Sequence, residues 1–176
     1  MIKTFAPIPL ATLLLTSMIF AQNSKLGAPG CGDPNTKFDS KPGKSGQTAQ
    51  LEAGKALVYF FENDTDFESR PRPTTRIGVD GQWVGANKAD SYFYISVDPG
   101  VHHLCASWQN APIFAHGIET VAAHFTAEVG VAYYYEVKNK WSDEHRSPSM
   151  SLTQLDSDQG QLLATKLALS DSHPKK

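Results

Sequence analysis

The sequence of 176 residues lacks the short motifs by which common enzymes are recognised. It holds no G-x-S-x-G, so no serine is expected on a nucleophile elbow. It also holds no H-x-H and no H-E-x-x-H, and its glycines do not lead from a strand into a phosphate-binding helix. We therefore predict no catalytic residue and no cofactor.

An excess of positive charge is also missing. The chain has 16 Lys and Arg against 18 Asp and Glu, which gives a formal net charge of −2 at pH 7. A nucleic-acid or anionic-membrane partner would show as a basic excess or cluster. The charge balance therefore indicates no nucleic-acid partner.

No apolar run is long enough for a transmembrane helix. The longest, Leu10 to Phe20, falls short of the about 20 residues that a bilayer requires. With Lys3 before it and Ala21 after it, the run is typical of a cleavable signal peptide, residues 1–21. We therefore expect an exported protein, periplasmic or secreted, without a transmembrane anchor.

Cysteine is scarce, since Cys31 and Cys105 are the only two. Cys31 follows Ala28 and Gly30, as an acylated cysteine would, but lies about ten residues beyond the apolar run, which argues against lipoprotein anchoring. An even count in an oxidising compartment favours a disulfide, worth roughly 4 kcal/mol for a loop of this length. The alternative is two unpaired thiols, one buried and one on a flexible arm.

Composition divides the remaining chain into three parts. Residues 22–54 are rich in Gly, Pro, Ser, Gln and Lys, so we expect an extended arm that the disulfide pins across the domain. Residues 55–169 carry the patterns of one β-sandwich domain. Residues 170–176 are expected to be a frayed tail.

The sharpest turn signal is Asp80-Gly81, which is favoured in a two-residue hairpin turn because both central residues need positive φ. Direct pairing across it sets Ile77 opposite Val84 and Trp83 opposite Gly78. The indole would then lie over a residue without a side chain, on the face away from Ile77.

A second hairpin is predicted around Pro99-Gly100, between SYFYISV and VHHLCASW. Simple pairing places Leu104 on the face of Phe93 and His103 on the face of Tyr94. A bulge would shift the register by one residue and reverse every face.

Further strands are predicted for KALVYFF, apolar on both faces and so central, and for VAAHFTAEV, VAYYYEVKN and MSLTQL. Asp156 is a candidate N-cap for a helix over residues 157–169. The fold class is therefore mainly β: an antiparallel β-sandwich or open barrel of six or seven strands with one C-terminal helix. We expect the helix to cover an edge or a face.

Several motifs carry a resemblance to a known family: K-A-L-V-Y-F (55–60), R-I-G-V-D-G (76–81), S-Y-F (91–93), V-D-P-G-x-H (97–102) and G-x-x-Y-Y (130–134). Together they resemble an exported bacterial family, domain of unknown function 2846, over residues 55–169. The hairpin with P-G-x-H-x-L is also similar to PEGA-type β-sandwich modules of bacterial envelope proteins. The resemblance implies a β fold and an envelope location, and it implies no chemistry. Many members of the family look like lipoproteins, and this chain departs from them in lacking an acylation site.

Histidine is the most tempting ligand type. His103 and His124 could meet on an outer face with Glu128, but His102 and His103 point to opposite faces of one strand. We therefore predict no metal site, with His103, His124 and Glu128 as weak candidates. For His102 we expect a hydrogen bond to nearby backbone.

Aromatic residues offer the best case for binding. Trp83, Tyr92, Tyr94 and Trp108 could share one outer face and stack on a sugar or a peptide. The alternative is that they are ordinary strand residues, covered by the arm or by the C-terminal helix.

The leading functional hypothesis is a non-enzymatic binding or scaffolding module of the bacterial envelope, with an envelope protein or a glycan as partner. The rival is a periplasmic enzyme that uses a metal or paired carboxylates. A third hypothesis is a subunit of a larger assembly whose arm becomes ordered on a partner.

Overall fold

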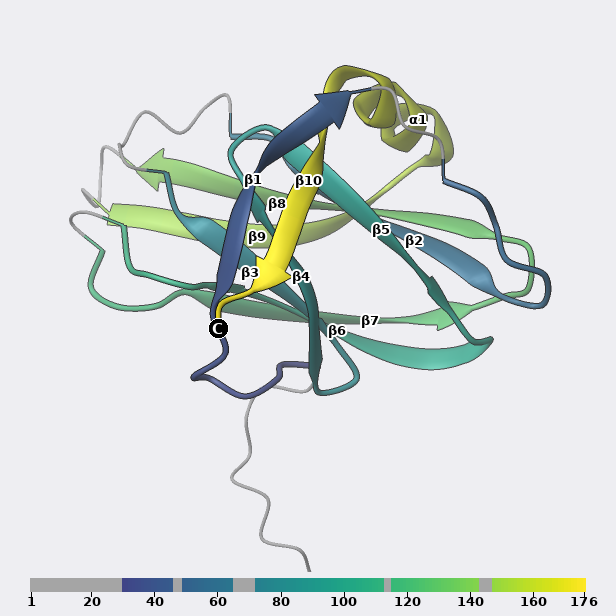
Figure 1. Cartoon of the computed structure of the whole chain (residues 1–176), viewed down its shortest axis with the longest axis horizontal. Helices are drawn as coiled ribbons and strands as arrows, with labels where there is room; N and C mark the ends of the chain where they lie inside the picture. Colours follow the sequence, from purple (N-terminus) through teal and green to yellow (C-terminus); the bar gives the residue numbers. More distant parts are fainter. Residues whose placement is uncertain (1–29, 46–48, 65–71, 113–114, 143–146) are drawn as a thin grey trace, which may run out of the picture.

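A computed structural model describes residues 30–45, 49–64, 72–112, 115–142 and 147–176. Residues 1–21, interpreted as the signal peptide, lie outside the described residues. The described chain is mainly β, with ten strands and one helix (Figure 1). No helix within these ranges is long and apolar enough to cross a membrane.

The elements follow one another along the chain as β1 (Phe38–Ser45), β2 (Ala56–Glu62), β3 (Thr74–Val79), β4 (Gln82–Lys88), β5 (Ser91–Val97), β6 (Gly100–Trp108), β7 (Thr120–Ala127), β8 (Ala132–Ser142), β9 (Ser147–Leu155), α1 (Ser157–Lys166) and β10 (Ala168–Pro174). They form two sheets. Sheet A has the order β1-β10-β5-β2-β8-β9, and sheet B has the order β4-β3-β6-β7.

The two sheets share one apolar core in a sandwich-like arrangement. Val58 and Phe60 of sheet A meet Ile77 and Leu104 of sheet B there. The predicted mainly-β class is confirmed, and neither sheet closes into a barrel over the described residues. The predicted six or seven strands are too few, since the described chain has ten. Their pairing is mostly antiparallel, as predicted, but sheet A is mixed, because β2 pairs with β8, and β10 with β5, in parallel.

Strand β2 is central, as its two apolar faces predict. It lies between β5 and β8, and its inner residues Ala56, Val58 and Phe60 are fully buried. On the other face, Phe61 is also fully buried. The continuous apolar run is therefore explained by cover on both sides of the sheet.

The hairpin at Asp80-Gly81 joins β3 to β4 with φ values of 51° and 81°. Trp83 lies opposite Gly78, as predicted. Ile77, however, lies opposite Gly85 and not Val84, because the register shifts by one residue between Ile77 and Gly78. The bulge adds one residue on β4, a feature that direct pairing does not include.

The second predicted hairpin is wrong. β5 belongs to sheet A and β6 to sheet B, so the turn after Val97 carries the chain across the core. Phe93 and Leu104 therefore face each other from opposite sheets, while Tyr94 and His103 lie on opposite outer faces. Alternation alone cannot separate the two arrangements, because both place the same residues in the core.

Strands β1 and β10 correct two predicted boundaries. Residues 38–45 of the expected arm form β1, and the tail expected to fray from Ser170 lies within β10, antiparallel to β1. β8 also extends beyond the predicted segment VAYYYEVKN, since it continues through Trp141 to Ser142. Only one residue of β1 and β10, Phe38, is buried. Both strands can therefore be polar in sequence, as FDSKPGKS and ALSDSHP are.

The β1–β10 ribbon also covers the open edge of β4. The hydroxyls of Ser40 and Ser170 donate to the Ala86 carbonyl at 2.9 and 2.8 Å. The Ala86 N–H donates to the Ser172 hydroxyl at 3.0 Å. Serine side chains thus satisfy peptide groups that an edge strand would otherwise expose.

A disulfide joins Cys31 to Cys105, with the two Cα atoms 5.1 Å apart, which confirms the predicted pair. It fixes the arm to the outer face of sheet B. Gly78 makes room for it, because a Cβ on Gly78 would collide with the Gly30 carbonyl. Arg76 donates to the carbonyls of Pro34 and Thr36, at 3.0 and 2.6 Å, and fastens the next residues.

Helix α1 begins where Asp156 predicts. The Asp156 carboxylate accepts a hydrogen bond from the Gln159 N–H at 2.9 Å. The helix ends at Lys166, three residues before its predicted end at residue 169. The helix ends there because Leu167 is extended and leads into β10. Leu163 and Leu167 cover aromatic residues on the outer face of sheet A, as expected of a helix that covers a face.

Candidate functional site

The four aromatic residues proposed for one binding face occupy three environments. Trp108 is in the core at 1% exposure. Trp83 lies under the arm, where its Nε1 donates to the Asp33 carbonyl at 2.7 Å and Arg76 stacks 4.4 Å from its ring centre. Tyr92 and Tyr94 share the outer face of sheet A, and only Tyr94 is partly exposed.

The candidate ligands His103 and His124 lie opposite each other in β6 and β7, with ring centres 6.4 Å apart. Glu128 follows the end of β7, where its backbone N–H donates to the Tyr133 hydroxyl at 3.0 Å. Within the described ranges, no three His, Cys, Asp or Glu residues are grouped closely enough to hold a metal.

The main concentration of buried polar groups lies between the sheets, near the start of β3 and the end of β6. We call it the polar end; its members are Glu62, Asp64, Thr75, Asn87 and Asn139, all with 0% exposure. Sequence reasoning missed it. Its one available signal is Glu62, which continues the inward-facing series of β2 after Val58 and Phe60.

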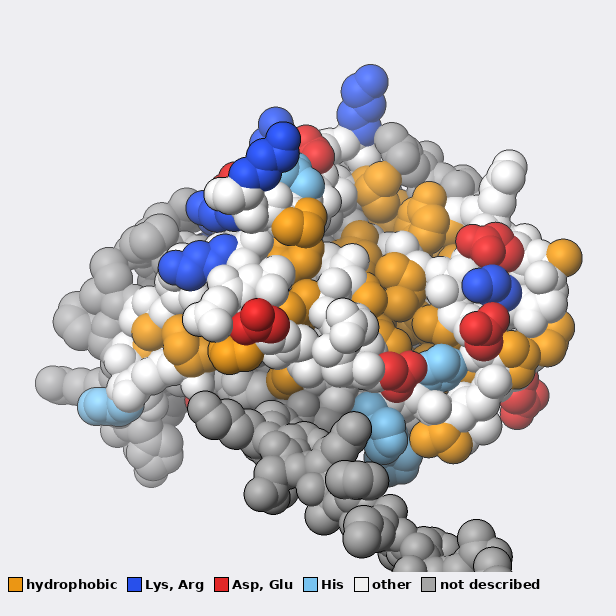
Figure 2. All heavy atoms as spheres, turned by 60° about the horizontal axis from the view of Figure 1, so that its bottom comes forward, with side chains coloured by type: hydrophobic (Ala, Val, Ile, Leu, Met, Phe, Trp, Pro, Cys, Tyr) orange, Lys and Arg blue, Asp and Glu red, His pale blue; other side chains and the backbone are white. Residues whose placement is uncertain are grey.

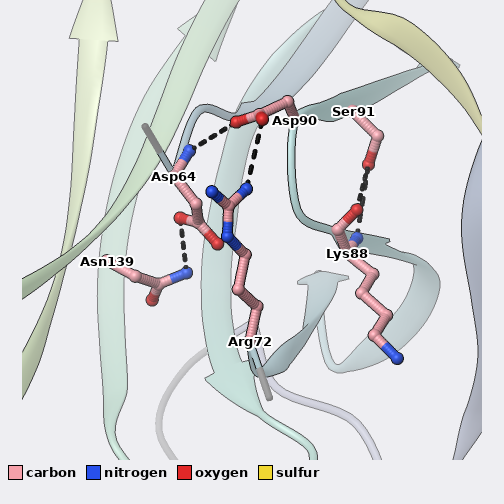
Figure 3. Close-up of polar contacts among 6 residues, drawn as sticks. All are labelled: Asp64, Arg72, Lys88, Asp90, Ser91 and Asn139. Atoms are coloured by element: carbon pink, nitrogen blue, oxygen red, sulfur yellow. Dashed lines mark hydrogen bonds and ion pairs between the residues drawn. The ribbon is translucent and has the colours of Figure 1, made fainter. Parts of the chain in front are cut away.

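A chain of hydrogen bonds runs through the polar end. Trp108 Nε1 donates to Asn139 Oδ1 at 2.7 Å, and Asn139 Nδ2 donates to Asp64 Oδ1 at 2.9 Å. Asp90 then accepts from the Asp64 backbone N–H at 3.0 Å and from Arg72 at 3.1 Å (Figure 3). The Arg72–Asp90 ion pair thus lies next to the buried acids.

Glu62 is the least satisfied member. Neither of its carboxyl oxygens has a hydrogen-bond partner among the described residues, although Thr75 and the Ala89 backbone lie near. Burial, and then the charge of Asp64, raise the pKa of Glu62 well above its usual value. Burial also raises the pKa of Asp64, although the nearby Glu62 carboxyl and the hydrogen bond from Asn139 lower it.

Two carboxyl groups that share a proton can act as an acid–base pair. Glu62 and Asp64 are out of contact with solvent, however, and the neighbouring cleft of about 170 Å³ is lined by other residues, among them Arg72, Thr74, Lys88 and Asn110. The arrangement therefore holds a proton inside the fold and presents neither acid to a substrate.

A second contact between titratable side chains, His102 and Asp80, lies at the opposite end of the β3–β6 pair. His102 Nδ1 lies 2.6 Å from Asp80 Oδ2, and Nε2 lies 2.7 Å from the Asp98 carbonyl oxygen. Asp80 Oδ1 also accepts the His103 N–H at 2.8 Å. The backbone bond expected for His102 is present, and the carboxylate partner is an addition. Figure 2 shows acidic and histidine side chains adjoining on the face that it draws.

Both ring nitrogens of His102 face acceptors, so the charged ring fits best. Partial burial opposes that charge, but the bonds to Asp80 and Asp98 outweigh it and raise the pKa of His102. For Asp80, burial is outweighed by the bonds from His103 and His102, which lower its pKa. This contact ties the β3–β4 turn to the crossing between the sheets.

Comparison with protein-family models and with curated proteins finds no match to this chain.

Replacement Glu62→Gln tests the buried proton. When the pKa of a carboxyl is higher in the folded than in the unfolded state, the folded state becomes less stable as pH rises above the unfolded pKa of about 4.3. The amide needs no proton, so we expect the stability of E62Q to rise relative to that of the wild type from pH 4 to pH 8, by up to about 1.4 kcal/mol per pH unit. Urea unfolding at pH 4, 6 and 8 measures the difference, with the exposed Glu128→Gln as control. An E62Q protein less stable than wild type at pH 8 contradicts the assignment.

Replacement His102→Gln tests the second contact. A histidine with a raised folded pKa stabilises the fold fully below its unfolded pKa of about 6.5, and this contribution is lost as pH rises through the folded pKa. We expect H102Q to cost about 1 kcal/mol at pH 5.5 and clearly less at pH 9. Unfolding curves at both pH values measure this, with the exposed His124→Gln as control. An equal cost at both pH values would refute it.

Proposed function

We propose that this chain is an exported, non-enzymatic binding module of the bacterial envelope that takes an uncharged glycan on the outer face of sheet A. The binding surface is the tyrosine face, which consists of Tyr59 and Tyr94 with the ring of Tyr134 beside them. The single observation that carries the proposal is that this aromatic layer is only partly covered.

Tyr59 is the centre of the layer. Its ring stacks on Tyr134 at 5.1 Å and lies 5.6 Å from the Tyr94 ring. Helix α1 packs against the same layer through Leu163, and Leu167, directly after the helix, adds to this contact. It leaves Tyr59 and Tyr94 partly exposed, so two rings remain for a ligand to cover.

The chemistry of the tyrosine face favours a neutral ligand with flat apolar faces. Burial, and then neighbouring tyrosines, raise the pKa of Tyr59, so its hydroxyl stays protonated and uncharged. Ser96 follows Tyr94 on the same face of β5 and adds a hydroxyl. Aromatic rings beside hydroxyls suit a sugar, which has an apolar ring face and a polar rim.

Three observations support an envelope location. The N-terminal residues have the pattern of a signal peptide. The Cys31–Cys105 disulfide requires an oxidising compartment to persist. The motifs that resemble the exported domain of unknown function 2846 and the PEGA-type modules point to the same place.

The rival function, a periplasmic enzyme with paired carboxylates, would have Glu62 and Asp64 as its acids. Their raised pKa values favour that reading. Their complete burial disfavours it, because general acid–base catalysis needs a heavy-atom contact of about 3 Å with the substrate. We therefore assign the pair to the interior of the fold, where it makes stability depend on pH, and not to catalysis.

Co-sedimentation with chitin, an insoluble and uncharged glycan, tests the proposed function. We expect the mature, disulfide-bonded protein to sediment with the glycan, and Tyr94→Ala to weaken binding about fivefold, which corresponds to about 1 kcal/mol of lost stacking. Tyr94→Phe is the matched control, since it keeps the ring and should bind within about twofold of wild type. Wild-type protein that stays in the supernatant, or equal binding by the alanine variant, would rule the proposal out.

A further inference from the structure

The outer edge of β7 is unpaired in the described part of the chain. β7 is the last strand of sheet B, and among the described strands it pairs only with β6. The Trp108 N–H donates to the Glu119 carbonyl at 3.1 Å, which fixes the alternation of the ladder. The peptide groups that point away from β6 are therefore those of Thr120, Ala122, His124 and Thr126.

This edge differs from the other strand edges of the molecule. β1 carries Lys41, Pro42 and Lys44, and β9 carries Pro148, which are residues that discourage pairing with another chain. The edge of β4 is covered by the β1–β10 ribbon, as described above. The sequence of β7, TVAAHFTA, has no Pro, Lys, Arg, Asp or Glu.

The edge is also complementary to itself. In an antiparallel pair centred on Ala123, Thr120 lies opposite the second copy's Thr126, and Ala122 opposite its His124. All four outward N–H and C=O groups of each copy then find partners. His124 does not face its own copy, so protonation places no like charges directly opposite.

The side chains on the inner face fit the same register. Val121 lies opposite the second copy's Phe125, and Ala123 opposite its own counterpart. In the single chain, Phe125 belongs to the core, while Val121 and Ala123 pack against it and are partly exposed. Pairing would cover these two residues and continue the apolar layer from one copy into the other.

We propose that two copies of this chain associate through antiparallel pairing of their β7 strands, so that sheet B continues from one copy into the next. This surface is separate from the tyrosine face, which lies on sheet A. A monomer could therefore still bind the glycan, and the two proposals can fail independently.

Sedimentation equilibrium of the mature protein from about 1 µM to about 1 mM tests the association. We expect a reversible dimer. Ala122→Pro should weaken it at least about tenfold, because proline removes an outward N–H and leaves the bonds to β6 in place. Ala122→Val keeps the N–H and is the matched control. Circular dichroism checks that each variant is folded.

A second measurement is independent of the variants. Amide hydrogen exchange of the wild type should slow with rising concentration at Thr120, Ala122, His124 and Thr126. A protein that stays monomeric over the whole range overturns the proposal. So does a dimer in which these four amides exchange as fast as in the monomer, or one that a folded Ala122→Pro variant forms equally well.

Discussion

The Cys31–Cys105 disulfide fastens a segment with almost no apolar side chains to the outer face of sheet B. Of the arm between residues 30 and 45, Phe38 is the only large apolar residue that is buried. Its backbone is held by Gln109, whose side chain accepts the Phe38 N–H at 2.5 Å and donates to the Phe38 carbonyl at 3.0 Å. The arm is therefore held in place by covalent and polar contacts, whereas the core is held together by apolar burial.

The consequences of this anchoring extend to the other end of the chain. β1 gives β10 its antiparallel partner, and the paired ribbon brings three serines to the edge of β4. One side of the molecule is closed in this way, whereas on the side that ends in β7 no described strand covers the edge. Polar contacts lie at both ends of the β3–β6 pair. Asp80 contacts His102 at one end, and Asp64 donates its backbone N–H to Asp90 at the other.

Local signals in the sequence predicted the features that depend on neighbouring residues. The two apolar faces of β2, the positive φ at Asp80, the cap at Asp156 and the cysteine pair all have a cause within a few residues or in the cysteine count. These features therefore give the mainly-β class and several local elements from the sequence alone.

Features that depend on distant parts of the chain could not be predicted. A hairpin and a crossing between sheets bury the same residues of β5 and β6, so alternation did not separate them. β1 and β10 are strands because they meet each other, and neither has an apolar pattern of its own. Asp64 looks like any loop acid until folding brings Asn139 to within 2.9 Å of it.

Amide hydrogen exchange in the disulfide-bonded protein and in a Cys31→Ser, Cys105→Ser variant tests the anchoring most directly. We expect the amides of β1 and β10 to lose most of their protection in the variant, together with Ala86 at the edge of β4, while β2 and β8 keep theirs. Protection in β1 and β10 equal to that in the wild type would show that the disulfide does not hold this ribbon in place, and so would an even loss across both sheets.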